Sequence, residues 1–227
     1  MLHKNKTRAR PLALAIGSLL LSAGTTHAAP PDVVQVQTPL SGSGSAAQET
    51  NAGNLLADAV RETGHADIGL VPADEIADAT VPAGSIPVTK LATLLRRPDD
   101  PDDTVVVLKI TGAQVLHALE LGLGHAPRPF PGFWQVSGLQ VRYDPAQPEG
   151  KRVSLAGVGG GEVSAGKTYT VATSRAVALG SLGYFRVWDK KDIAQNTGIP
   201  VAQSVAAYAA AHKTIHSAVE GRITAAH

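Results

Sequence analysis

Apolar residues recur at helical spacing in two segments of the first half of the chain. In NLLADAVRETG, which starts at Asn54, the leucines, alanine and valine share one helical face. Thr50 or Asn51 is the candidate N-cap, and Gly64 is the expected stop, followed by His65 at a capping turn. The leucines of residues 89–96 are also spaced as on a helix.

Two apolar runs have the composition of strands. Residues 67–71 form a short apolar run, and TVVVLKI over 104–110 is β-branched and typical of a buried strand. Thr111 and Gln114 then predict a capping box, because each side chain can satisfy the other's free backbone amide. A helix with an apolar face is expected to follow and to end near Gly124.

Three further strands are expected in the second half, over residues 139–143, 152–158 and 168–173, joined by turns rich in Gly, Pro and Asp. Such spacing predicts an antiparallel meander. A last helix is expected over 201–212, behind Pro200. The predicted fold class is therefore α+β, with mixed sheets, an antiparallel meander and packed helices.

The N-terminal pattern is that of an export signal. The first ten residues carry four basic and no acidic side chains, and an apolar run over 12–21 and a small-residue stretch over 22–29 follow. This order indicates a secretory signal peptide over residues 1–28, cleaved after Ala28 or Ala29, with a buried core helix as the alternative. The chain is then exported, periplasmic or secreted, with no membrane contact after cleavage.

Composition and charge bear on the domain organisation, the partners and the chemistry of the chain. Residues 29–48 are rich in Pro, Ser and Gly and are expected to be a flexible linker, which leaves one domain over 49–227. Without the four leader cations the chain keeps 16 basic against 19 acidic residues, a net charge of −3. Nucleic acid is therefore not an expected partner. The chain has no cysteine, which excludes disulfides and thiolate chemistry.

The segment GEVSAGKT over 161–168 fits the phosphate-loop pattern G-x-x-x-x-G-K-[ST]. A working phosphate loop leads into a helix whose N-terminus points at the phosphates. Here Lys167 and Thr168 lead into the alternating, β-branched segment YTVAT instead. We therefore interpret the glycines as a hairpin turn and Lys167 as a solvated residue.

Other catalytic patterns are weak. His212 and His216 have helical ligand spacing, but no Glu follows the first histidine, and surface histidines are the better interpretation. The four aspartates of residues 99–103 alternate with proline and suit a solvated loop better than a calcium site. No G-x-S-x-G nucleophile motif is present.

Several strings together resemble the C-terminal, substrate-binding domain of the bacterial 5′-nucleotidase / UDP-sugar hydrolase family. The resemblance covers about residues 49–212, and the strings are ETNAGNLLADAVR, PAGSIPVTKL, TVVVLKITGAQVLHALELGL, FWQVSGLQVRYDP and GKTYTVATS. It implies the 5′-nucleotidase C-terminal fold, in which GKT enters a strand.

The resemblance also implies where the chemistry lies. In that family a preceding metallophosphoesterase domain holds two divalent metals and hydrolyses phosphate esters. Its D-x-H motif does not occur in this chain, and the only Gly-Asn pair, Gly53-Asn54, is followed by Leu55. We therefore expect no catalytic residue, metal or other cofactor of its own, and activity only if a separate metallophosphoesterase partner supplies divalent metals.

The family's nucleoside site carries over only in part. Phe133 takes the place of the first stacking ring and Gln135 that of an Asn beside the base, with Trp134 between them. Phe133 and Trp134 could equally be core residues. The second ring falls on Ala176. The glycine motif G-G-D-G-Y keeps Gly180, Gly183 and Tyr184 but replaces its Asp by Leu182.

A second family motif, N-G-G-G-I-R, reads PADEIA over residues 72–77 here and lacks both the Asn and the Arg. An Arg offers a bidentate grip that Ala cannot replace. Arg96 and Arg97 lie close in sequence and could compensate, or they could be solvated loop residues.

Three hypotheses follow. The chain is a module that binds a nucleoside or nucleotide without hydrolysing it, a subunit of a 5′-nucleotidase-type hydrolase in nucleotide catabolism, or an interaction protein whose pocket has degenerated.

Overall fold

The computed structural model describes residues 1–2 and 33–226. The expected signal peptide lies almost entirely outside the described residues. The elements of the domain are β1 (Val33–Val36), β2 (Leu40–Ser41), α1 (Asn51–Gly64), β3 (Ile68–Pro72), η1 (Ala73–Glu75), β4 (Thr80–Val81), β5 (Gly84–Pro87), η2 (Val88–Leu94), β6 (Thr104–Thr111), α2 (Gly112–Leu123), β7 (Trp134–Ser137), β8 (Leu139–Tyr143), β9 (Val153–Val158), β10 (Gly161–Glu162), β11 (Thr168–Ser174), α3 (Arg175–Ala178), η3 (Ser181–Arg186), η4 (Lys190–Asp192), β12 (Ile193–Pro200), α4 (Val201–His212), β13 (Thr214–Ile215) and β14 (Ile223–Ala225).

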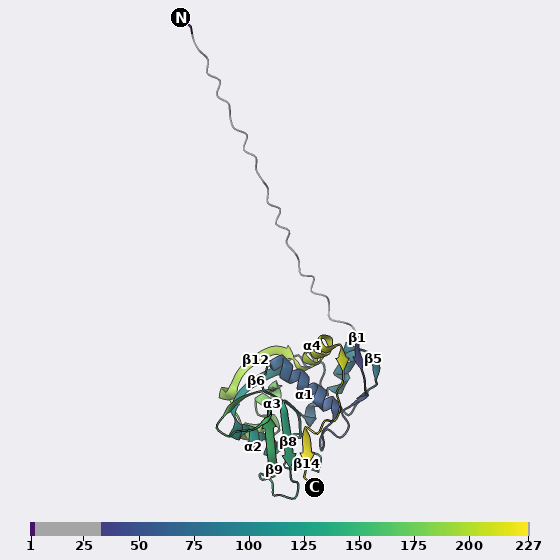
Figure 1. The fold of residues 1–227 in the computed structure, drawn as a ribbon, viewed down its shortest axis with the longest axis vertical. Helices are drawn as coiled ribbons and strands as arrows, with labels where there is room; N and C mark the ends of the chain where they lie inside the picture. The colour runs from purple at the N-terminus through teal and green to yellow at the C-terminus, as the bar shows by residue number, and fades with distance from the viewer. Residues whose placement is uncertain (3–32, 227) are drawn as a thin grey trace.

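A five-stranded mixed sheet has the order β12-β6-β11-β3-β7. Its strands β12 and β6 lie beside helix α1 (Figure 1). Strand β6 alternates its apolar side chains between two cores, as a strand covered on both faces must. Val105 packs with α1 and α4 on one face, whereas Val106, Leu108 and Ile110 pack with α2 on the other. The expected α+β class is confirmed.

The expected antiparallel meander is present, but its third strand is not the one that the sequence predicted. β8, β9 and β10 pair in antiparallel succession, and β14 adds to β8 in parallel. The strand over 168–174, expected to continue this meander, is β11 and lies between β6 and β3 of the five-stranded sheet. Because β6 is apolar on both faces, it must lie inside a sheet, and β11 is one of its two neighbours.

The expectation of a flexible linker over 29–48 is wrong from residue 33 onward. β1 pairs with β13 and β5, and β2 pairs with β4. Val34, Val36 and Leu40 are at most 1% exposed. The alternation of VVQV buries every second side chain, and this strand pattern outweighs the linker-like composition of the segment.

The expected helix ends are confirmed. Thr50 Oγ1 accepts a hydrogen bond from the Gly53 amide, and His65 ends α1 in a left-handed conformation with φ 47°. Thr111 and Gln114 form the capping box of α2, and α4 begins directly behind Pro200. The expected helix over 89–96 is a 3₁₀ segment.

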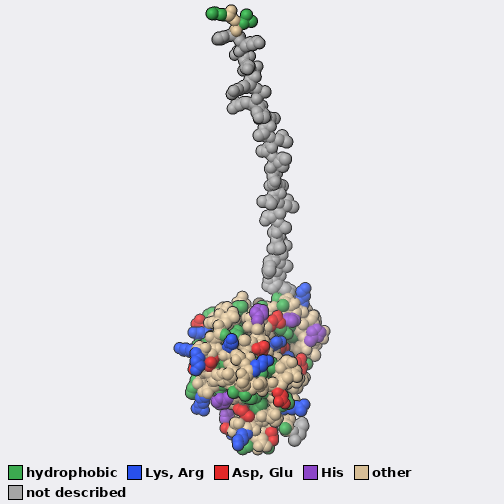
Figure 2. Space-filling view, turned by 60° about the vertical axis from the view of Figure 1, so that its left-hand side comes forward, with side chains coloured by type: hydrophobic (Ala, Val, Ile, Leu, Met, Phe, Trp, Pro, Cys, Tyr) green, Lys and Arg blue, Asp and Glu red, His purple; other side chains and the backbone are tan. Residues whose placement is uncertain are grey.

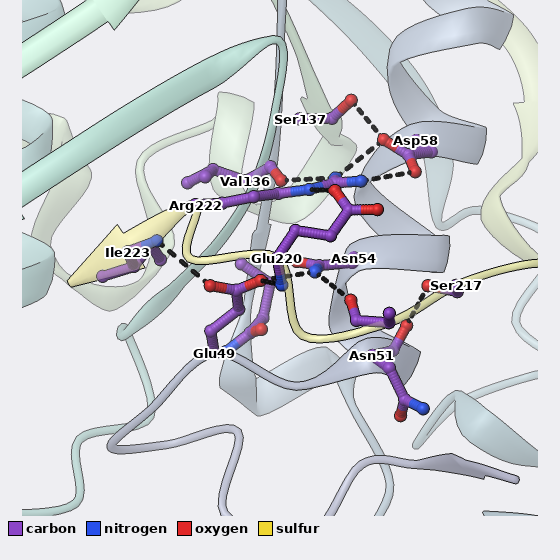
Figure 3. A network of polar contacts seen from close by, with 12 residues as sticks. Glu49, Asn51, Asn54, Asp58, Val136, Ser137, Ser217, Glu220, Arg222 and Ile223 are labelled. Carbon is purple, nitrogen blue, oxygen red and sulfur yellow. Dashed lines mark hydrogen bonds and ion pairs between the residues drawn. The ribbon is translucent and has the colours of Figure 1, made fainter. Parts of the chain in front are cut away.

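The C-terminal segment is fastened to the start of α1 through Glu49, which is 7% exposed. The Glu49 carboxylate accepts hydrogen bonds from Asn54 Nδ2 at 2.6 Å and from the amides of Glu220 and Ile223 at 2.7 and 3.2 Å (Figure 3). A buried carboxylate with three donors is well satisfied, so Glu49 joins the start of α1 to the C-terminal segment.

No helix among the described residues is long and apolar enough to cross a membrane. On the face in Figure 2, basic and acidic side chains are interspersed, so this face has a field of mixed sign.

Candidate ligand-binding site

The turn after β3 lies against the segment that leads into β7. The amide of Ala73 donates to the Phe133 carbonyl at 2.9 Å, and the amide of Asp74 donates to the Pro131 carbonyl at 2.8 Å. These bonds extend the antiparallel pairing of Pro72 with Trp134. The fold therefore brings together residues 72–77 and 133–135, two stretches that the sequence assigned to one pocket.

The aromatic residues of this region form a closed core. Phe133, Trp134 and Tyr184 are 0% exposed. The Tyr184 ring lies 4.5 Å from the Trp134 ring and 5.1 Å from that of Trp188, measured between centroids. Burial therefore favours the core interpretation of Phe133 and Trp134, because neither offers an exposed face on which a base could stack.

The polar atoms of this core are paired internally. Trp134 Nε1 donates to the Ala118 carbonyl at 3.0 Å, and Tyr184 Oη donates to the Gly132 carbonyl at 2.9 Å. Burial raises the pKa of Tyr184 well above its ordinary value, so the phenol keeps the proton that it donates.

Gln135 is also buried, but it serves the N-terminal segment. Its Oε1 accepts from the Thr50 amide at 2.9 Å, and its Nε2 donates to the carbonyls of Ser45 and Gln48 at 3.0 and 2.8 Å. These three bonds use most of the amide's capacity. Gln135 therefore holds residues 45–50 in place and has no free side towards a ligand.

Gly180 and Gly183 shape the turn that carries Tyr184. Their φ values are 96° and 90°, which only glycine adopts readily. Leu182, at the place of the family's Asp, also has positive φ, at 55°. The glycines thus fold the chain back so that Tyr184 enters the core, and Leu182 carries backbone strain.

An open hollow lies immediately outside this core. It has a volume of about 460 Å³ and is lined by Ala46, Ala73, Asp74, Arg96, Pro129, Phe130 and Pro131. A smaller hollow of about 250 Å³ adjoins it, shares four of these residues and adds Asp78. Phe130 is half-buried, and its ring packs 4.4 Å from that of His125. Sequence reasoning missed Phe130, although an aromatic residue between two prolines in a loop is a signal for a surface contact.

Arg96, one of the two arginines that could compensate for the missing one, lines both hollows. Its Nε donates to the Asp74 carbonyl at 2.8 Å, and its Nη2 donates to the Ile76 carbonyl at 3.1 Å. These two hydrogen bonds hold the guanidinium in place. Among the described residues Nη1 has no acceptor, so it can donate to a ligand. Arg97 instead forms an exposed ion pair with Asp74 at 3.4 Å.

Glu75 is an unexpected buried carboxyl beside this site. It is 3% exposed; Oε1 accepts a hydrogen bond from Ser174 Oγ, and Oε2 has no partner among the described residues. Burial, followed by repulsion from Asp103, raises the pKa of Glu75 to about 8. Glu75 is thus mainly protonated at neutral pH. In the sequence, the only indication that Glu75 is buried is its position shortly after an apolar strand.

The structure also describes the phosphate-loop pattern and His212, which the sequence discounted as catalytic features. GKT enters strand β11 as expected, but residues 163–167 join β10 of the four-stranded sheet to β11 of the five-stranded sheet and therefore do not form a hairpin turn. His212 forms an exposed ion pair with Glu62 at 2.9 Å. Among the described residues, no group of three or more His, Cys, Asp or Glu side chains could hold a metal ion.

The sequence of residues 24–189 matches the family described as 5′-nucleotidase, C-terminal domain. The chain belongs to this family. The 5′-nucleotidase precursor from Thermus thermophilus shares 28% identity, with a TM-score of 0.73 over 85% of this chain and 39% of that protein. The NAD nucleotidase NadN from Haemophilus influenzae has the same fold at 18% identity and TM-score 0.70, over 86% of this chain and 38% of that protein.

No curated protein matches this chain. The chain spans about two fifths of the length of the two solved nucleotidases. This chain shares its fold with the Thermus thermophilus nucleotidase over most of its length.

Proposed function

We propose that this 5′-nucleotidase C-terminal domain binds a nucleoside, or the nucleoside part of a nucleotide, in the hollow between Phe130 and Arg96. The observation that carries the proposal is the combination of a half-buried aromatic ring and a fixed arginine in an opening of about 460 Å³. Small-molecule sites have volumes of roughly 300–1,000 Å³ and few, well-placed polar groups.

Each lining group has a role in this proposal. Phe130 offers a face on which a base can stack, an interaction worth roughly 1–3 kcal/mol. The free nitrogen of Arg96 donates to a base or sugar oxygen. Asp74 and Asp78 can accept hydrogen bonds from sugar hydroxyls and disfavour several phosphate groups by like-charge repulsion. We therefore expect adenosine to bind at least as well as AMP or UDP-glucose.

Calorimetric titration of the chain with adenosine, AMP and UDP-glucose tests this proposal. Phe130→Ala should weaken adenosine binding at least about tenfold, equivalent to about 1.4 kcal/mol. Phe185→Ala is the matched control, because Phe185 is also a surface aromatic residue but does not line the hollow. Flat titrations at millimolar ligand, or equal affinity in Phe130→Ala, would refute the proposal and favour an interaction protein with a degenerate pocket.

A second function is favoured by an exposed apolar pair next to the glycine turn. Leu179 and Phe185 are 44% and 66% exposed and flank Gly180. Such a pair suits contact with another protein. A separate metallophosphoesterase chain that docks here would supply the divalent metals and the hydrolysis, and this chain would hold the substrate.

Two measurements test this second function. The chain alone, with AMP and Mn²⁺, should release no phosphate, whereas adding a metallophosphoesterase chain should give activity that Phe185→Ala lowers. Hydrolysis by the chain alone would contradict the division of labour.

Export is part of both proposals. Mass measurement of the N-terminus of the cellular protein tests whether the signal peptide is cleaved after Ala28 or Ala29.

A further inference from the structure

A second cleft lies at the other end of the β3–β7 pair from the Phe130 hollow. Pro72 pairs with Trp134 at the hollow, whereas Gly69 pairs with Ser137 beside the cleft. The cleft has a volume of about 450 Å³, and its walls come from α1, the β7–β8 junction, the β9–β10 hairpin and the C-terminal segment.

Arg61 of α1 is fixed along one wall of this cleft. A Cβ atom at Gly69 would lie 2.8 Å from Arg61 Cβ, and one at Gly138 would lie 3.0 Å from Arg61 Cδ. The two glycines thus make room for the arginine stem. Arg61 Nε donates to Ser137 Oγ at 2.7 Å.

The terminal nitrogens of Arg61 are free to bind a ligand. Within residues 33–226, no carboxylate lies at ion-pair distance from Arg61, and its Nη atoms donate no hydrogen bond. An arginine held at Nε presents its two terminal amino groups in a fixed fork, the geometry that binds a carboxylate through two parallel hydrogen bonds.

The second arginine of the cleft, Arg222, is already occupied. It donates to both Asp58 oxygens at 2.8 and 2.9 Å, to the Val136 carbonyl at 2.9 Å and to Glu220 at 2.9 Å (Figure 3). Asp58 also accepts a hydrogen bond from Ser137 Oγ. Asp58 and Arg222 therefore balance each other, and this network fixes the serine that holds Arg61.

Two further carboxylates in the cleft carry negative charge, opposite to that of Arg61. Glu162 is exposed on the β9–β10 hairpin, and Glu220 has one oxygen on Arg222 and one with no donor among the described residues. A ligand with several negative charges would be repelled by these groups. A ligand with one anionic and one cationic group would match both Arg61 and the glutamates.

We propose that this cleft binds a small zwitterion of the amino-acid type. Its carboxylate pairs with the Arg61 guanidinium, its ammonium group lies towards Glu162 and Glu220, and its side chain lies over Leu155, which is 37% exposed in the cleft. Because the site shares no residue with the Phe130 hollow, the proposal is independent of nucleoside binding.

Titration of the full chain followed by amide NMR tests the proposal, with glycine, L-leucine and L-glutamine as zwitterions. Isocaproate and isoamylamine are the matched fragments of leucine that keep only the carboxylate or only the ammonium group. We expect saturable shifts at the amides of residues 157–161 for the amino acids, and at least about tenfold weaker binding of each fragment. No shifts up to about 10 mM amino acid, or isocaproate binding as tightly as leucine, would overturn the proposal.

Two substitutions test which side chain binds each charged group of the ligand. Arg61→Gln and Glu162→Gln should each weaken amino-acid binding about tenfold. Glu162 is exposed on a two-residue strand, so its substitution leaves the fold intact. Arg128→Gln, at an exposed arginine outside the cleft, is the matched control and should bind as the parent chain does. Unchanged affinity in both cleft variants overturns the proposal, whereas adenosine binding should be the same in all of them.

Discussion

Glu75 should make the stability of this domain depend on pH. Its pKa is raised from 4.5 to about 8, first by burial and then by repulsion from Asp103. Between these two pH values the folded chain holds a proton that the unfolded chain releases. The stabilisation is therefore fully present below about pH 4.5 and is lost as the pH rises through about 8.

The size of this effect follows from the two pKa values. Each pH unit in the interval lowers the free energy of unfolding by about 1.4 kcal/mol, so the whole interval corresponds to about 4–5 kcal/mol. Glu75→Gln cannot ionise and keeps an oxygen that accepts from Ser174 Oγ. The variant should therefore lack this slope and should gain stability over the parent chain as the pH rises.

Urea unfolding of both proteins, at several values from about pH 5 to about pH 8, measures the difference. Comparing the two proteins cancels the histidines and other groups that titrate in both. Glu162→Gln is the control, because Glu162 is exposed and should leave the slope unchanged. A difference between Glu75→Gln and the parent chain that stays constant across this range would refute the assignment of the slope to Glu75.

Three other substitutions test the packing that positions the sites. Gln135→Leu should lower the free energy of unfolding by about 2–4 kcal/mol, because three buried backbone groups lose their partner; the exposed Gln140→Leu should change little when unfolded in parallel. Arg222→Met should cost about 3 kcal/mol by leaving a largely buried carboxylate unpaired, and most of that loss should vanish in the Asp58→Asn background; equal losses would contradict the pairing. Leu182→Gly should be neutral or stabilising, by up to about 1 kcal/mol in thermal unfolding, because it relieves a positive φ; clear destabilisation would show that the leucine side chain matters more.

Local signals in the sequence were enough for the helices α1, α2 and α4 and for the strands β3, β6, β8, β9 and β11, but not for the shorter strands of the described residues. The cap at Thr50, the capping box at Thr111 and the proline before α4 each act within a few residues, so their effect can be read without the fold. The partners of the strands could not be read in this way. Strand β11 pairs with β6 about 60 residues away, and no local pattern distinguishes that pairing from a meander.

Strands β1 and β2 were missed for a related reason. The following stretch SGSGSAAQ gives the segment around them a linker-like composition, and strand β1 has only four residues. Its stability comes from β5 and from β13, which lies near the other end of the chain. A short strand is stable only through its neighbours, so its sequence alone is a weak signal.

In the candidate site, too, the sequence indicated which residues lie nearby but not which way their side chains face. Residues 133–135, which the resemblance assigned to the ligand pocket, lie next to the turn after β3, but all four residues of WQVS in β7 are buried. A polar side chain in a strand covered on both faces must find its partners inside the protein, because leaving it unpaired costs several kcal/mol. Gln135 finds them in residues 45–50, so its amide stabilises the wall of the hollow. In the proposed nucleoside site, ligand contacts therefore fall to groups outside the covered strand, namely Phe130 and Arg96, which line the hollow.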